Sequence, residues 1–138
     1  MNECRKVTRI FSVAEITPID RGNGIRSIPL VGEETGSERL LTGYTIVPPG
    51  GKIPFHTHSS EECIVVLEGD AAVDVDGRRT RLRPLDATYV SGGVEHRFVN
   101  LGQTDVRILW IYSDIHITRT FTESGETSGH LDRYRAKR

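Results

Sequence analysis

The central part of the chain alternates short apolar runs with turn residues. Strands are predicted at residues 41–47, 62–67, 73–75, 78–82, 87–90, 96–99 and 106–112. Asp76-Gly77 separates two of these runs and is a strong signal for a two-residue hairpin. Other apolar runs end at turn segments, namely Pro48-Pro49-Gly50-Gly51 and Ser91-Gly92-Gly93. Many short strands joined by Gly-rich turns predict an all-β fold, either a barrel or a double-sheet jelly roll.

The flanking segments divide the chain into three sections. Residues 1–39 are expected to form an N-terminal arm with edge strands, including a weak strand over residues 7–16. Residues 40–112 hold the barrel, and residues 113–138 a final strand and a polar tail. The strand is indicated by Ile115 and Ile117, which alternate with polar residues. Because aromatic residues scarcely interleave the basic end, it indicates a solvated tail and not a nucleic-acid surface.

Composition and charge narrow the class of protein. With 138 residues the chain has the size of one domain, and its net charge of −1 predicts no pull toward nucleic acid or an acidic membrane. No apolar run is long enough to cross a bilayer, and the charged N-terminus lacks the apolar stretch of a signal peptide. The two cysteines, Cys4 and Cys63, indicate no disulfide framework. We therefore expect a cytoplasmic protein.

The segment GGKIPFHTHSSEECIVVLEG, residues 50–69, contains the most informative chemistry. Residues i and i+2 of a strand point to one face, so His56 and His58 direct two imidazoles at the same point. Glu62 follows at the start of the next strand, and His96 heads a later one. Imidazoles and a carboxylate are a donor set that suits divalent first-row transition metals.

The same residues resemble the paired signatures of the cupin family. Gly50, His56, His58, Glu62 and Gly69 fill every fixed position of the first signature, G-x5-H-x-H-x3-E-x6-G. The second signature, G-x5-P-x-G-x2-H-x3-N, is matched by Gly93, His96 and Asn100. Leu85 and Ser91 stand at its first Gly and its Pro, which are turn positions and not ligands. The resemblance extends over roughly residues 40–112.

This resemblance implies a single cupin jelly-roll β-barrel, also called a double-stranded β-helix. It also implies that His56, His58, Glu62 and His96 bind one divalent ion, whether Fe, Mn, Ni or Zn. Four protein ligands leave two positions of an octahedral ion open. The chain shows neither a G-x-S-x-G nucleophile motif nor a dinucleotide or phosphate loop, so the metal is the evident source of reactivity.

Cupins have diverse activities, so several functions stay open at this point. One is a metal-dependent enzyme acting on a small oxygenated molecule, with a dioxygenase slightly ahead of a non-redox lyase or isomerase. The other is a non-catalytic module that binds a small ligand. The resemblance also suggests a homodimer, in which the N-terminal arm of one chain pairs with the other and protects a barrel edge.

Strand parity gives a candidate lining for a substrate pocket. If Glu62 and His96 face inward, so do the alternate residues that follow them. The candidate pocket residues are Tyr44, Ile64, Val66, Phe98 and Asn100. Trp110, like Tyr44, is equally consistent with plain barrel core. Strand parity predicts that Arg97 lies on the surface. Arg26 is kept as a candidate for binding an anionic substrate.

Overall fold

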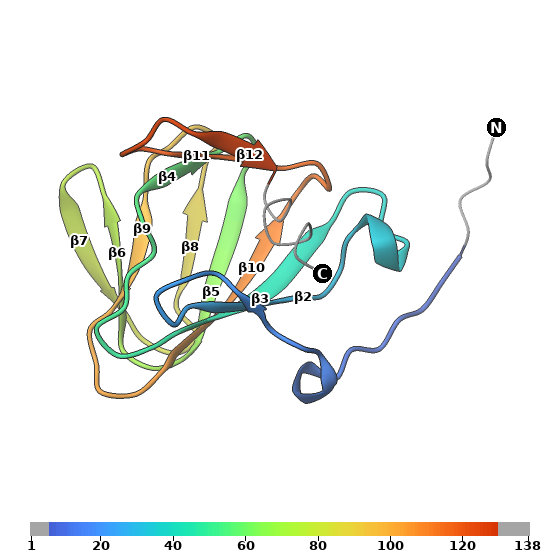
Figure 1. Cartoon of the computed structure of the whole chain (residues 1–138), viewed down its shortest axis with the longest axis horizontal. Coiled ribbons are helices and arrows are strands. Elements are labelled where there is room, and N and C mark those ends of the chain that lie inside the picture. The colour runs from blue at the N-terminus through green and yellow to red at the C-terminus, as the bar shows by residue number, and fades with distance from the viewer. Residues whose placement is uncertain (1–5, 130–138) are drawn as a thin grey trace.

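The structure is a computed structural model, and it describes residues 6–129 (Figure 1). This part of the chain is almost entirely β, with two short 3-10 helices and no α-helix. The elements are η1 (Val13–Glu15), β1 (Ile19–Asp20), β2 (Arg26–Pro29), η2 (Glu33–Thr35), β3 (Leu41–Val47), β4 (His56–His58), β5 (Glu62–Glu68), β6 (Ala71–Val75), β7 (Arg78–Leu82), β8 (Ala87–Val90), β9 (Arg97–Asn100), β10 (Val106–Tyr112), β11 (Thr118–Phe121) and β12 (Thr127–Gly129). Within the described residues, no helix is long and apolar enough to span a membrane.

The strands form one large sheet and two smaller ones. The six-stranded sheet has the order β1-β2-β3-β10-β5-β8, and its pairs are antiparallel. The others are β12-β11-β4 and β7-β6-β9. In Figure 1, β4, β11 and β12 lie across the top of the molecule. Sequence-distant strands such as β3, β5 and β10 are neighbours, which is the crossing connectivity of a jelly roll.

A single bridge joins the two smaller sheets. His56 and His96 pair antiparallel and exchange two backbone hydrogen bonds of 3.1 and 3.0 Å, so β4 continues toward β9. Lys52 and Val99 form a second isolated bridge along the same seam. The composite sheet therefore faces the six-stranded one, and the predicted jelly-roll barrel is confirmed.

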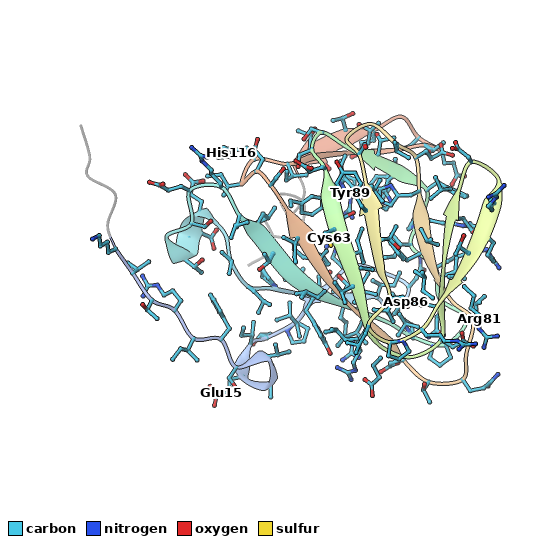
Figure 2. The ribbon with its side chains drawn as sticks, turned by 180° about the vertical axis from the view of Figure 1, so that it is seen from behind. Glu15, Cys63, Arg81, Asp86, Tyr89 and His116 are labelled. Atoms are coloured by element: carbon cyan, nitrogen blue, oxygen red, sulfur yellow. The ribbon has the colours of Figure 1, made fainter. Side chains whose placement is uncertain are left out.

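The core lies between these sheets and follows the alternation of the strands. In β10 every second residue is buried, from Val106 through Ile108 and Trp110 to Tyr112. In β5, Ile64 and Val66 are buried between more exposed neighbours. Cys63 and Tyr89 mark the outer side of the large sheet (Figure 2). Cys63 is a free, half-buried thiol there.

The predicted strands of the barrel agree with the observed ones, and β1 and β2 lie at the edge of the six-stranded sheet within residues 1–39, but the strand predicted over residues 7–16 is wrong. No strand forms over residues 7–16, because η1 and irregular backbone occupy that segment. Ile10 is 94% exposed and has no neighbouring strand to pair with in the described chain. The strand predicted after residue 113 is β11, which begins only at Thr118, and β12 follows it as a hairpin partner that the sequence did not indicate. Most of the polar tail lies outside the described residues.

Two turns show how local sequence determines backbone geometry. Asp76 and Gly77 both have positive φ, 52° and 70°, as a type I′ hairpin requires, so this prediction is confirmed. Leu85 also has positive φ, 76°, at the place where the second cupin signature carries Gly. Its amide donates to Val66 O at 2.7 Å, which keeps the turn closed despite the unfavourable conformation.

Leu85→Gly is therefore expected to stabilise the protein. Glycine removes the left-handed strain of about 1–2 kcal/mol, and its greater freedom in the unfolded chain offsets part of that gain. The side chain is 79% exposed, so little packing is lost. Urea denaturation should show a gain of roughly 0.5–1 kcal/mol in the free energy of unfolding. Leu85→Ala, which keeps the strain, should show no gain; equal stabilisation by both variants would refute the explanation.

Candidate metal centre

Three histidines converge because of strand register. His56 and His58 occupy alternate positions of β4 and share one face. His96 is directly opposite His56 in the bridge between the smaller sheets. All three are buried, and each offers a ring nitrogen within 4.8 Å of the others. Two sequence-distant segments thus present three imidazoles to one point.

Backbone carbonyls orient two of these rings. His56 Nδ1 donates to Pro54 O at 2.6 Å, and His96 Nδ1 donates to Val94 O at 2.9 Å. These bonds place the proton on Nδ1, so the Nε2 lone pair is available to a metal. His96 Nε2 is fully buried and has no hydrogen-bond partner in the described structure. A buried nitrogen with no partner is costly, and a bound cation would satisfy it.

Glu62 approaches from the opposite sheet. Its Oε1 lies 3.4 Å from His96 Nε2 and 3.6 Å from His58 Nε2. Tyr112 is its register partner in β10, and the Tyr112 hydroxyl lies 2.9 Å from His58 Nε2. Glu62 is outside the compact group formed by the three histidines. The Glu62 carboxylate is therefore in direct contact with the imidazoles of His58 and His96.

Burial keeps the imidazoles of His56 and His58 neutral. Desolvation, reinforced by the neighbouring His96, lowers the pKa of His56 from 6.5 to about 3. Desolvation and the nearby His56 lower the pKa of His58 further. The charges of Arg119 and Arg21 add to both effects. Burial and the Glu62 carboxylate raise the pKa of Tyr112 well above its usual value, so this hydroxyl keeps its proton at neutral pH.

These observations test whether the residues suit a metal. Neutral imidazole is the form that binds a cation, and the low pKa values provide it. The three rings, which are tilted against one another, bring their nitrogen donors together, and His96 Nε2 has no hydrogen-bond partner in the described structure. The His56, His58 and His96 group can hold a divalent metal ion, and nitrogen donors of this kind are compatible with Fe, Ni, Zn and other first-row ions.

The histidines border a large cavity between the sheets. Its volume is about 1050 Å³, enough for a molecule of drug-like size. Glu62, Ile64 and Phe98 line it, as parity predicted. Trp110 also lines it and donates from Nε1 to Thr45 Oγ1 at 2.8 Å. The walls thus combine apolar surface with a few placed polar groups.

Three of the predicted pocket residues do not border this cavity. Tyr44 lies on the other side of β3 from cavity-lining Thr45, and its hydroxyl accepts a hydrogen bond from Arg107 at 3.3 Å. Val66 is fully buried in the core. The Asn100 amide donates to Val47 O and Thr104 O, so it braces a turn instead of facing a ligand. Strand parity correctly predicted that Val66 and Asn100 are buried, but the cavity occupies only part of the interior.

The sequence reasoning missed several cavity residues. Arg21, Arg119 and Tyr112 line the cavity, and Arg97 does so too, although parity had placed it on the surface. Arg97 lies over the Phe55 ring at 4.3 Å and donates to Asp74 at 2.8 Å. Arg119 is two residues after Ile117, so the same strand alternation would have placed its side chain on the inner face. That pattern could have identified it as a cavity residue. Arg26 is exposed, with Asp105 4.0 Å away, and does not line the cavity.

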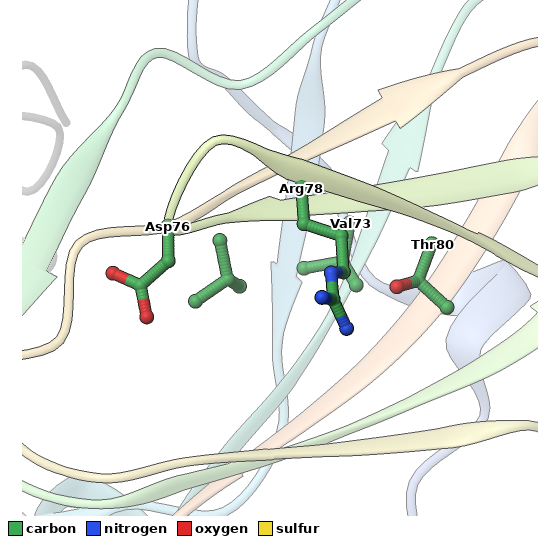
Figure 3. A pocket seen from close by; sticks show the side chains of 5 residues that line it. Val73, Asp76, Arg78 and Thr80 are labelled. Carbon is green, nitrogen blue, oxygen red and sulfur yellow. The ribbon is translucent and has the colours of Figure 1, made fainter.

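A second, smaller hollow lies at the β6–β7 hairpin (Figure 3). Its volume is about 360 Å³, and it is lined by Val73, Val75, Asp76, Arg78 and Thr80. It contains no histidine and shares no residue with the large cavity. Asp76 and Arg78 belong to an exposed turn, so this hollow offers no comparable donor set.

Comparison with known proteins agrees with this geometry. Residues 43–112 match the family model described as a cupin domain. The chain is 33% identical to "Polyketide synthase CurC" of Streptomyces cyaneus over 109 residues, covering 78% of this chain and 70% of that protein. The segment that matches the family model includes all three histidines of the site.

Solved structures show the same fold at lower identity. The polyketide cyclase RemF from Streptomyces resistomycificus is 23% identical with a TM-score of 0.70, over 77% of this chain and 79% of its own. Salicylate 1,2-dioxygenase from Pseudoaminobacter salicylatoxidans, in complex with gentisate, is 20% identical with a TM-score of 0.62. That match covers 70% of this chain but only 27% of the dioxygenase. With its jelly roll, its converging histidines and its matching family model, this chain belongs to the cupin family.

Proposed function

We propose that the protein is a metal-dependent enzyme acting on a polyoxygenated, polyketide-type molecule that presents a 1,3-dicarbonyl or its enol. The observation that carries this proposal is the set of three buried imidazoles at the wall of a cavity of about 1050 Å³. The likeness to the polyketide synthase protein CurC supports the substrate class. Molecules of this class chelate through two oxygens, which suits an ion with two open positions.

In this proposal His56, His58, Glu62 and His96 hold the ion. A divalent ion bound there would supply Lewis acidity toward a carbonyl oxygen of the substrate. Glu62, which approaches from the six-stranded sheet, would offset part of the positive charge of the ion. Tyr112 holds a proton on its hydroxyl beside His58 and Glu62, where it can donate to an oxygen that gains negative charge. Ile64, Phe98 and Trp110 exclude water around the bound molecule.

A dioxygenase is the second candidate, and the apolar cavity wall favours it. An iron-loaded site would need to shield a reactive oxygen species from solvent, and the same three side chains would do so. The solved dioxygenase that shares the fold binds gentisate, a compound with adjacent oxygen functions. Candidate substrates on this branch are enediols and catechol-like acids.

Metal loading separates the two branches. Protein purified without a chelating tag is loaded with Fe(II), Mn(II), Ni(II) or Zn(II) and offered acetylacetone, a triketide lactone or catechol. Turnover with Zn(II) or Mn(II) and no oxygen uptake supports the Lewis-acid enzyme. Oxygen uptake confined to the Fe(II) form supports the dioxygenase. Failure to retain any of the four ions would contradict both and favour a non-catalytic binding module.

Glu62→Gln is expected to reduce turnover by at least about 100-fold on either branch, because a neutral amide is a weaker ligand and offsets no charge. Glu61→Gln is the matched control, since Glu61 is an exposed neighbour whose carboxylate accepts from Tyr89. Steady-state rates and metal content of both variants provide the measurement. Unchanged turnover in Glu62→Gln at full metal content would contradict the assigned role of Glu62.

We also propose a homodimer in which the N-terminal arm of each chain packs against the other. Residues 6–12 extend away from the barrel in Figure 1, and Ile10 is 94% exposed there. An isolated apolar side chain on an extended arm gains stability when a partner covers it. Light scattering at micromolar concentration should give twice the chain mass. Ile10→Asp should shift the protein toward monomer and Ser12→Asp should not; a monomeric wild type would refute the proposal.

A further inference from the structure

Arg119 is positioned beside the histidines by strand register. It is directly opposite His58 in the β11–β4 pair, and Phe121 is opposite His56. Residues directly opposite in an antiparallel pair point to the same face, with Cβ atoms about 5 Å apart. Arg119 is only 8% exposed, lines the cavity, and lies over the Phe121 ring at 4.8 Å. A buried guanidinium therefore faces the same cavity as the three imidazoles.

Arg21 reaches the cavity from the turn between β1 and β2. Its Nη1 donates to Ser27 Oγ at 3.0 Å, and Ser27 and Thr45 hydroxyls are 2.9 Å apart. Thr45 in turn accepts from Trp110 Nε1. This chain of polar groups runs along the cavity wall and holds Arg21 at its end. Two guanidiniums from opposite ends of the sequence thus border one cavity.

The other charged groups of the cavity differ from these two arginines in sign, burial or position: Glu62 is a buried carboxylate beside the histidines. Arg97 is engaged by Asp74, which also receives two hydrogen bonds from Arg79. Lys52 is exposed, as are two carboxylates of the β11–β12 turn, and water screens them. Arg119 is buried and Arg21 half-buried, so their charge acts in a less polar medium and on a ligand beside the histidines.

We propose that Arg119 and Arg21 form an anion subsite and that the substrate carries a carboxylate next to the two oxygens it presents to the metal site. This inference rests on the proposed function and adds to it the charge of the substrate. Guanidinium binds carboxylate through parallel, charge-assisted hydrogen bonds, which are stronger than neutral ones in a buried site. The Ser27–Thr45–Trp110 chain keeps Arg21 in place for this contact.

A matched ligand pair tests the subsite without measuring activity. Binding of 2,3-dihydroxybenzoate and of catechol, which differ by one carboxylate, is measured by calorimetry on metal-free and on Zn(II)-loaded protein. The wild type should prefer 2,3-dihydroxybenzoate by about tenfold or more, since hydrogen bonds to charged groups contribute at this level. Arg119→Gln and Arg21→Gln should each lose most of this preference while still binding catechol in the Zn(II) form.

Controls separate charge from folding. Arg81→Gln removes the same charge from the exposed β6–β7 hairpin (Figure 2) and should keep the full preference. Arg119→Lys, which keeps the charge but not the planar fork, should lie between wild type and Arg119→Gln; thermal melting verifies that each variant is folded. If Arg119→Gln does not fold, Arg21→Gln decides alone.

The outcomes distinguish this inference from the proposed function. A wild type that binds both ligands equally, or neither, overturns the subsite, as does a preference that survives in both folded arginine variants. A carboxylate preference that depends on the arginines, together with affinities for both ligands that are the same with and without Zn(II), supports the subsite and counts against metal chelation. Zn(II)-dependent catechol binding without any carboxylate preference supports metal chelation and overturns the subsite.

Discussion

Replacing His96 by alanine is expected to weaken binding of a divalent ion by at least about 100-fold, since even residues that only orient metal ligands contribute 10–100-fold. His96 is fully buried, and its Nε2 has no hydrogen-bond partner in the described structure, although Glu62 Oε1 lies 3.4 Å away. Plasma emission analysis of dialysed protein should show metal content falling from near one ion per chain to well below it. The melting temperature of the wild type should rise when metal is added, and that of the variant should not.

His116→Ala is the control for this prediction. His116 is exposed, near Glu33 at 3.9 Å, and belongs to neither signature. Its replacement should leave metal content and the metal-dependent shift in melting temperature unchanged. Full occupancy in a folded His96→Ala variant would show that the three histidines do not act as one site.

The largest loss of stability is expected from Trp110→Ala. The indole is 3% exposed, packs against Gly43 on the neighbouring strand, and donates to Thr45. A Cβ added at Gly43 would lie 2.1 Å from indole Cζ2, which shows how closely the ring approaches that backbone. Truncation removes this packing and leaves the Thr45 hydroxyl with one hydrogen bond fewer. The free energy of unfolding should fall by about 3–5 kcal/mol in urea denaturation.

Tyr89→Ala provides the comparison. Tyr89 is also an aromatic residue on the six-stranded sheet, but it is 64% exposed on the outer side of β8 (Figure 2). Its truncation should change the free energy of unfolding by less than about 0.5 kcal/mol. Equal losses in the two variants would mean that Trp110 does not anchor the core between the sheets.

Local pattern was sufficient for most of the barrel. The run over residues 106–112 and the Asp76-Gly77 turn were predictable because alternation and positive φ are properties of neighbouring residues. The segment over residues 7–16 has a similar composition but no strand. A strand needs a partner for its backbone groups, and no other part of the described chain pairs with this arm. Propensity therefore predicted a strand that pairing did not provide.

The candidate site divides in the same way. His56 and His58 share a face by periodicity alone, and the matched signatures added Glu62 and His96. Parity then placed Ile64 and Phe98 on the cavity, but it could not tell the cavity from the packed core around Val66. Arg119 was overlooked because its importance comes from its register opposite His58, in a different strand.

The all-β class, most strand positions, the Asp76-Gly77 turn and the two-histidine motif can be predicted from the sequence, because each depends on residues close together in the chain. Which residues meet across the barrel depends on the pairing of the strands in three dimensions. The bridge between His56 and His96, the approach of Glu62 and the placement of Arg21 and Arg119 on one cavity involve segments that strand order brings together. Such contacts follow from sheet pairing over long sequence separations, which no local pattern encodes.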